Sequence, residues 1–327
     1  MRAVVCPALG DPSTLVVEDV PSPAMIARGV RIRVRAAALN FADTLMIKGT
    51  YQEKRTPPFV PGLEAAGEVI ETAPGVTRVK IGDRVMALVS GGAFAEEAVA
   101  EEGRVWPIPD GMDYTAAAGF PIVYGTSYLA LADRARLKAG ETLVVHGAAG
   151  GVGLTAVEIG KRLGATVIAV AGGADKLALA KAHGADHALD HRTEDLRTRI
   201  KELTDERGAD VVYDPVGGGA FEASLRSTAP DGRIVVVGFA SGEVPQIPAN
   251  ILLVKNLTVI GLYWGAYRNI RPEDFARQFD VLLGWWKEGA LRPHASHVLP
   301  LAEAREAFAA LLARRSAGKV ALVMEDA

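Results

Sequence analysis

Cysteine is almost absent from this chain. Its 327 residues include a single cysteine, Cys6. One thiol cannot form an intrachain disulfide, and it cannot supply the several thiolates of a multi-cysteine zinc site. A disulfide-stapled scaffold and a cysteine-rich zinc lobe are therefore both excluded.

The sequence also has little of what would direct it to a membrane or to nucleic acid. Its first residues, MRAVVCPALG, lack the layout of a signal peptide, and no apolar run is long enough to span a bilayer. The formal net charge is −3, and no long basic stretch is present. We therefore expect a cytoplasmic protein with neither a nucleic-acid partner nor a membrane partner.

What the sequence does contain is a globular composition, with 49% hydrophobic and 23% charged residues. Its length exceeds that of one ordinary domain, so two domains are the natural expectation. No internal repeat or low-complexity segment stands out.

The most informative stretch runs from residue 142 to residue 170. A short apolar run, 142–146, is typical of a buried parallel strand. A glycine cluster follows, then apolar positions spaced as in a helix that packs on a sheet. Gly164 stands where a helix C-cap glycine belongs, and 165–170 reads as a second strand. The pattern predicts one strand–glycine turn–helix–strand unit.

The glycine turn predicts a phosphate-binding site. Glycines let the backbone bend tightly and approach a ligand, and the following helix offers free N–H groups and a positive dipole end. The dinucleotide fingerprint GxGxxG is matched with Ala148 in its first position, followed by Gly150 and Gly153. The alternative is a structural turn without a ligand. The cofactor contacts expected here are Ala149, Gly150, Gly151, Val152 and Gly153.

The two parts of the chain differ in texture. Up to about residue 120, short strands alternate with Gly/Pro turns, as in an all-β module of the partly open barrel type. From near Asp113 to Tyr263, strands alternate with helices, which predicts a doubly wound parallel sheet. The tail is expected to return to the first module. The predicted domains are therefore 1–121 with 266–327, and 122–265.

Five segments carry a family resemblance: NFADTLMIKG (40–49), PFVPGLEAAGEV (58–69), GDRVMAL (82–88), AAGGVG (148–153) and YDPVGG (213–218). With them the chain resembles the zinc-independent quinone oxidoreductase family of the medium-chain dehydrogenase/reductase superfamily. The resemblance implies a GroES-like catalytic domain, a Rossmann nucleotide-binding domain and a cleft between them. It also implies a homodimer built through the edges of the nucleotide sheets.

No metal is expected. Zinc alcohol dehydrogenases of this superfamily carry a cysteine where Asn40 stands and a histidine where Leu63 stands, and neither residue offers a zinc ligand. His183, His187 and His191 flank one helix–strand junction, but no carboxylate or cysteine cluster completes a tetrahedral set.

The expected absence of a metal limits the reactions that the protein could catalyse. A quinone or an activated alkene can take a hydride directly from a reduced nicotinamide, because its own carbonyl delocalises the charge. The protein then has to position the acceptor, polarise its oxygen and exclude water. We expect an NADPH-dependent quinone reductase. The alternatives are a reductase of α,β-unsaturated carbonyls (enones) or enoyl thioesters, and a nucleotide-binding structural or RNA-associated protein with little catalysis.

The resemblance assigns three catalytic candidates. The Asn40 amide would donate to the acceptor oxygen, Tyr51 would line the quinone site, and the Thr126 hydroxyl would meet the nicotinamide. Asn40 and Thr126 are thus also cofactor contacts. Each has a plainer alternative: a turn asparagine, a loop aromatic and a helix hydroxyl bonded to its own backbone. A second tyrosine of the family segment is replaced by Leu45. Asp43 and Glu64 are taken as structural. After a strand end, Gly238, Phe239 and Ser241 are expected to contact the nicotinamide through their backbone.

Cofactor choice depends on the end of the second strand. NAD-dependent Rossmann domains carry a carboxylate there for the ribose hydroxyls, whereas this chain has Ala171 followed by Gly172 and Gly173. Lys176 matches a lysine that the family uses against the 2′-phosphate, and His191 stands where relatives often have a tyrosine near it. The cofactor expected is therefore NADPH. Asp175 is assigned to the N-terminus of the following helix.

Overall fold

Contacts within the chain divide it into two compact units. The computed structural model describes residues 1–324. One unit, the barrel unit, comprises Met1–Ile122 and residues 293–324, and the other, the parallel-sheet unit, comprises Val123–Arg292. The last three residues of the predicted 266–327 segment lie outside the described residues.

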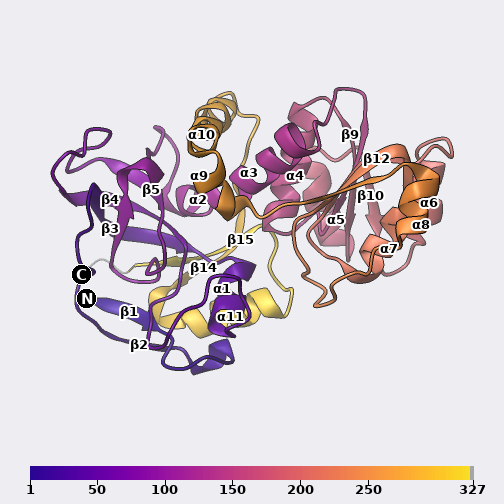
Figure 1. Ribbon diagram of the computed structural model, residues 1–327. Helices are drawn as coiled ribbons and strands as arrows, with labels where there is room; N and C mark the ends of the chain where they lie inside the picture. The colour runs from indigo at the N-terminus through magenta and orange to yellow at the C-terminus, as the bar shows by residue number, and fades with distance from the viewer. Residues whose placement is uncertain (325–327) are drawn as a thin grey trace. The chain divides into compact units, whose positions relative to one another are not determined.

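The parallel-sheet unit is built on six parallel strands in the order β10-β9-β8-β11-β12-β13 (Figure 1). The first strand of the unit therefore lies at the centre, and the chain changes direction between β8 and β11. Open α/β sheets bind ligands at such a switch point, outside the carboxyl ends of the strands. The predicted doubly wound sheet is confirmed. Its strands are β8 (Thr142–His146), β9 (Thr166–Ala171), β10 (His187–Asp190), β11 (Ala209–Asp214), β12 (Thr228–Val236) and β13 (Thr258–Gly261).

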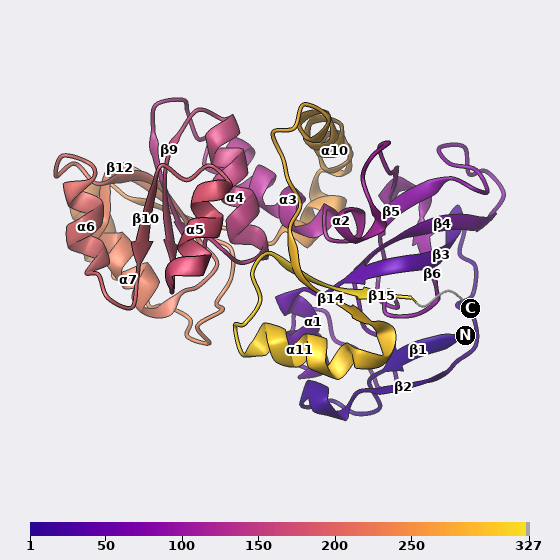
Figure 2. The ribbon, with the colours of Figure 1, turned by 180° about the vertical axis from the view of Figure 1, so that it is seen from behind.

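Helices connect these strands and cover the sheet. Figure 2 shows α4 and α5 beside β9 and β10. Helix α4 contacts β8 and β9, and α5 contacts β9 and β10. The predicted helix cap is also present, because Gly164 follows the end of α4 with a φ of +85°. The helices are α3 (Pro121–Tyr128), α4 (Gly151–Arg162), α5 (Ala174–Ala182), α6 (Leu196–Glu202), α7 (Gly218–Ser227), α8 (Ala249–Lys255), α9 (Tyr267–Ile270) and α10 (Pro272–Lys287).

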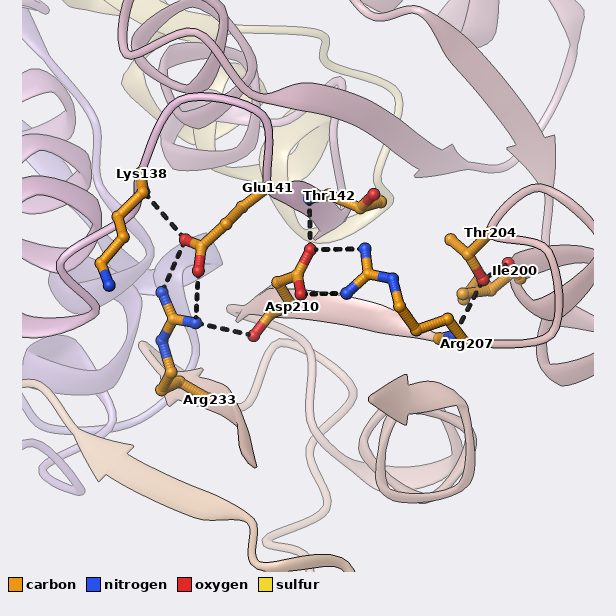
Figure 3. A network of polar contacts seen from close by, with 9 residues as sticks. Lys138, Glu141, Thr142, Ile200, Thr204, Arg207, Asp210 and Arg233 are labelled. Carbon is orange, nitrogen blue, oxygen red and sulfur yellow. Dashed lines mark hydrogen bonds and ion pairs between the residues drawn. The ribbon is translucent and has the colours of Figure 1, made fainter. Parts of the chain in front are cut away.

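Ion pairs tie together the strands at the amino end of the sheet (Figure 3). The Arg233 guanidinium donates two hydrogen bonds to Glu141, at 2.9 and 2.7 Å, and so joins β12 to the start of β8. Asp210 on β11 accepts the N–H of Thr142 at 2.7 Å and pairs with Arg207. The glycine turn at 147–153 lies at the opposite, carboxyl end of β8.

The barrel unit contains a mostly antiparallel sheet in the order β14-β15-β3-β4-β5-β7, with β6 also pairing β3. The predicted return of the C-terminal strand is confirmed, since Ala321 of β15 pairs with Ala38 of β3. Helix α11 packs on β14 and β15. The strands are β1 (Arg2–Val5), β2 (Val16–Asp19), β3 (Gly29–Ala38), β4 (Glu64–Thr72), β5 (Arg84–Leu88), β6 (Glu97–Glu101), β7 (Val105–Pro107), β14 (Ala295–Pro300) and β15 (Lys319–Val323); the helices are α1 (Phe41–Ile47), α2 (Tyr114–Ala118) and α11 (Ala304–Leu312).

Residues 266–292 lie in the parallel-sheet unit, whereas the sequence assigned them to the barrel domain. The reason is an aromatic cluster. Phe275 of α10 stacks on Trp264, with ring centroids 4.8 Å apart, and also meets Phe279 edge-on at 6.1 Å. Burying these rings packs α10 against Trp264, which follows β13 in the chain.

Candidate functional site

The glycine turn lies at the carboxyl end of β8. Gly147 has a φ of +57°, and α4 begins at Gly151. A Cβ added to Gly153 would lie 2.1 Å from the carbonyl oxygen of Gly147, so only glycine allows the helix to start this close to the turn. The first N–H groups of an α-helix have no intrahelical acceptor. The N–H of Gly150 donates to Gly147 O at 2.8 Å, whereas the first turn of α4, from Gly151 to Gly153, directs its N–H groups to the carboxyl end of the sheet, where an anion is favoured.

The side chains of Arg192 and His191 lie beside the paired glycines at the end of β9. A Cβ on Gly172 would lie 2.6 Å from Arg192 Nε and 2.9 Å from His191 Nε2, so both side chains lie over this glycine. Lys176 stands on the first turn of α5 and is half-buried. Gly172 is thus covered by a guanidinium and an imidazole, groups that can bind a 2′-phosphate.

A carboxylate beside the glycine pair, that of Asp190, accepts two backbone N–H groups. Asp190, at the end of β10, accepts the N–H of Gly173 and the N–H of Arg192, both at 3.0 Å. The Arg192 bond is the largest of the effects that lower the pKa of Asp190. Arg192 was missed by the sequence analysis. The available signal was its position directly after His191, just beyond a strand end.

The loops after β11 and β12 are hydrogen-bonded to each other. The N–H of Ala240 donates to Pro215 O at 3.0 Å, and the N–H of Ser241 donates to Val216 O at 2.9 Å. Asp214 Oδ1 fixes the first loop by accepting the Val216 and Gly217 N–H groups at 2.8 and 3.0 Å. Residues 238–241 are therefore held at the same carboxyl edge of the sheet as the glycine turn.

Thr126 lies on α3 and is 7% exposed. Its neighbour Ser127 fastens α3 to the sheet: the Ser127 hydroxyl lies 2.8 Å from Thr155 Oγ1 and 3.0 Å from the Tyr213 hydroxyl. Within residues 1–324, the Thr126 hydroxyl makes no hydrogen bond to its own helix.

In the barrel unit, Asn40 belongs to a buried polar cluster with Glu64 and Lys319. Asn40 is the N-cap of α1, Glu64 begins β4, and Lys319 begins β15. Lys319 Nζ donates to Asn40 Oδ1 and Glu64 Oε1 at 2.8 Å each and to Leu39 O at 2.7 Å. Asn40 Nδ2 donates to Glu64 Oε1 at 2.9 Å. We define these three residues as the Asn40 cluster.

Asp43 lies next to this cluster and has a perturbed acidity. Its Oδ2 accepts the N–H of Asn40 at 2.7 Å, which completes the capping box of α1. Burial raises the pKa of Asp43 to about 7, against the lowering effects of the Asn40 hydrogen bond and of Lys319. Within residues 1–324, its Oδ1 has no hydrogen-bond partner.

Tyr51, the remaining catalytic candidate, follows α1 and is half-buried, with its N–H bonded to Leu45 O at 3.1 Å. The predicted site residues thus fall into two groups. Those at the carboxyl edge of the parallel sheet are Ala149, Gly150, Gly151, Val152, Gly153, Lys176, His191, Gly238, Phe239 and Ser241. Thr126 is in the same unit on α3, whereas Asn40 and Tyr51 belong to the barrel unit.

Residues 1–324 contain no group of three or more His, Cys, Asp or Glu side chains placed to bind a metal ion. His183 is engaged by a carboxylate, with its Nδ1 2.6 Å from Glu158 Oε1. Over the same residues, no helix has the length and apolar character needed to cross a bilayer.

Comparisons with known proteins agree with this geometry. Residues 27–110 match the family described as alcohol dehydrogenase GroES-like domain, and residues 151–282 match the family described as zinc-binding dehydrogenase. The predicted GroES-like module is thereby confirmed.

Whole-chain relatives cover almost all of the sequence. A quinone oxidoreductase-like protein 2 homolog from Nematostella vectensis is 42% identical over 98% of this chain and 88% of its own length. A quinone oxidoreductase from Pseudomonas aeruginosa is 38% identical over 97% of each chain. The crystal structure of Escherichia coli quinone oxidoreductase complexed with NADPH has a TM-score of 0.93 and 29% identity, covering 99% of this chain and 100% of that one.

Proposed function

Since the chain belongs to the zinc-independent quinone oxidoreductase family of the medium-chain dehydrogenase/reductase superfamily, we propose that it is an NADPH-dependent quinone reductase. The observation that carries this proposal is the carboxyl edge of the parallel sheet. There, a glycine turn precedes α4, and Arg192 and His191 lie over Gly172. In the proposal these two side chains, together with Lys176 on the first turn of α5, bind the adenosine phosphate.

Two positions at this edge have no room for a side chain in the structure. A Cβ would lie 2.1 Å from Gly147 O at Gly153 and 2.6 Å from Arg192 Nε at Gly172, so neither position could carry the carboxylate of an NAD-binding domain. Each carboxylate oxygen of Asp190 already accepts a backbone N–H, which leaves this side chain less available to ribose hydroxyls. These two features together favour NADPH over NADH.

The reaction proposed is NADPH + quinone + H⁺ → NADP⁺ + hydroquinone. When bound, NADPH supplies the hydride, which carries both electrons to the acceptor, and a solvent proton completes the hydroquinone. Asn40 would donate its amide N–H to the acceptor oxygen that gains negative charge, Tyr51 would line the acceptor site, and the Thr126 hydroxyl would meet the nicotinamide. The role of the protein in this scheme is to position the acceptor and polarise its oxygen.

The domain roles follow from these assignments. We propose that residues 1–121, with the C-terminal return, form the catalytic domain and that the parallel-sheet unit binds the nucleotide. We also propose a cytoplasmic location, which a chain with one cysteine fits.

A homodimer through the sheet edge is part of the same proposal. β13 is the edge strand of the parallel sheet, and the adjacent α8 exposes Leu253 and Val254, each 77% exposed. An edge strand beside exposed apolar side chains is the kind of surface that a second copy of the chain would cover.

A substrate panel tests the function. NADPH oxidation is followed by absorbance with an ortho-quinone, a para-quinone, an enal and an enoyl thioester. We expect turnover with at least one quinone and a lower KM for NADPH than for NADH. Turnover confined to the enal or the thioester would instead establish the alternative reductase. Tight NADPH binding with no turnover on any acceptor would leave only a nucleotide-binding role.

A further inference from the structure

The Asn40 cluster contains charges that the proposed reaction does not use. Glu64 is fully buried, and the Lys319 side chain is 8% exposed, although 255 residues separate them in sequence. Burying an ammonium and a carboxylate is costly even when they are paired, and apolar residues of the same volume are often as stabilising. A stability role alone is therefore a weak explanation of the pair.

The geometry shows what the pair does to Asn40. The ammonium faces Asn40 Oδ1 at 2.8 Å, and the carboxylate faces Asn40 Nδ2 at 2.9 Å. A flipped amide would place N–H groups against the ammonium and an oxygen against the carboxylate. Both charges therefore select the same orientation of the Asn40 amide. While they are in place, the amide cannot flip and the side chain cannot change its rotamer.

The cluster is rigid because its other bonds are also made. Lys319 Nζ has three donor hydrogens and three acceptors, since it also donates to Leu39 O at 2.7 Å. Glu64 Oε2 accepts the N–H of Ile122 at 2.9 Å, which fixes the second carboxylate oxygen. The stem of Lys319 packs against Gly119, where an added Cβ would lie 3.1 Å from Lys319 Cγ.

The two amide hydrogens of Asn40 are held unequally. Nδ2 carries two hydrogens. It donates to Glu64 Oε1 at 2.9 Å and, over a longer distance of 3.4 Å, to Ala38 O, so the second N–H makes a weak bond that a ligand oxygen can replace. A cation on the oxygen of an amide polarises its N–H groups and makes them stronger donors.

We propose that Lys319 and Glu64 are positioning residues that orient and polarise the Asn40 amide, so that its second N–H binds the oxygen of the hydride acceptor. This inference rests on the proposed function, in which Asn40 meets that oxygen. The ligand class is a carbonyl oxygen that gains negative charge. The charge pair acts through Asn40 and does not itself touch the acceptor.

The main test uses the full-length protein and a double-mutant cycle. Lys319→Met should lower kcat with a quinone about 10- to 100-fold, as loss of a positioned donor does. The KM for NADPH should stay within about twofold, because the proposed phosphate contacts lie on other elements. In an Asn40→Ala background, Lys319→Met should have no further effect on kcat. Additive losses from the two substitutions would overturn the inference.

A second variant separates positioning from folding. Lys319→Met leaves the Glu64 carboxylate buried without its cation, so we expect a lower melting temperature. Lys319→Met/Glu64→Gln removes both charges and should recover most of that loss while kcat stays about tenfold or more below wild type. Recovery of both quantities would mean that the pair is only structural.

A matched control is Glu102→Gln. Glu102 is another buried carboxylate of the barrel unit, bonded to Arg28 and to the N–H of Arg78, and it has no hydrogen bond to the Asn40 cluster. The Glu102→Gln substitution should lower the melting temperature but keep kcat within about twofold of wild type. A kcat loss equal to that of Lys319→Met would show that any destabilisation of the barrel suffices, which overturns the inference.

Acceptor dependence gives an independent readout. Without the polarised donor, weakly electrophilic quinones should lose more rate than strongly electrophilic ones, so the slope of log kcat against acceptor reduction potential should steepen in Lys319→Met. An unchanged slope overturns the inference while leaving the quinone reductase function intact. Wild-type protein that turns over no acceptor overturns both.

Discussion

Gly153 and Gly147 touch so closely that a Cβ on Gly153 would lie 2.1 Å from the Gly147 carbonyl oxygen. Gly153→Ala should therefore displace the start of α4, cost about 1–3 kcal/mol of unfolding free energy and weaken NADPH binding. Urea denaturation and a fluorescence titration with NADPH measure the two effects. Gly219→Ala in α7 is the matched control, since its Cβ would meet nothing within 4 Å. Equal behaviour of the two variants would contradict this account of the turn.

Lys176 and Arg192 should set the preference for NADPH. Lys176→Ala and Arg192→Ala should each raise the KM for NADPH and hardly alter the KM for NADH. The preference for NADPH should fall by about 1–3 kcal/mol, the scale of a charge-assisted hydrogen bond. Steady-state kinetics with both cofactors provide the measurement. Lys181→Ala, in the last turn of the same helix, should leave both values unchanged. A wild type that prefers NADH would disprove the assignment.

Asp43 should make the protein less stable as pH rises. Its folded pKa of about 7 exceeds its ordinary value of 3.8, so between these values the unfolded chain releases a proton that the folded chain keeps. The stability contributed by the protonated form is present at low pH and is lost towards pH 7, by at most about 4 kcal/mol.

Asp43→Asn removes this dependence and still offers an oxygen to the N–H of Asn40. Relative to wild type, the variant should gain stability at pH 8 compared with pH 5, as measured by urea denaturation. A stability difference that is the same at both pH values would show that Asp43 does not titrate in this range.

Zinc should be dispensable. Asn40 and Leu63 stand where zinc alcohol dehydrogenases of the superfamily have a cysteine and a histidine, and Asn40 is bonded to Lys319 and Glu64. Elemental analysis should find no stoichiometric zinc, and chelators should leave NADPH oxidation unchanged. About one zinc per chain, removed together with activity, would reverse this conclusion.

The exposed edge of the parallel sheet should carry the dimer contact. Leu253→Glu/Val254→Glu places charge on the exposed face of α8, so the protein should elute as a monomer in size-exclusion chromatography with light scattering. Ile81→Glu, which charges a 65% exposed side chain of the barrel unit, is the control and should not alter the mass. A wild type that is already monomeric would refute the predicted dimer.

The sequence by itself determined the parallel-sheet unit and its phosphate-binding turn. These features are local: a strand, a glycine turn and a helix lie within about thirty residues, and the periodicity of apolar side chains records them. The sequence of residues 170–176 was also sufficient to predict that the glycine pair and Lys176 contribute to cofactor choice.

Only the tertiary structure decided which distant residues meet. Lys319 reaches Asn40 and Glu64 because β15 pairs with β3, and no sequence spacing encodes that contact. Arg192 lies over Gly172 because β10 pairs with β9, which brings the two strand ends together. Residues 266–292 belong to the parallel-sheet unit, where Phe275 packs on Trp264, so the second segment of the barrel unit begins at Pro293. In each case, burial and strand pairing between segments far apart in the chain determined which residues are in contact. Local secondary-structure propensity does not encode such long-range contacts.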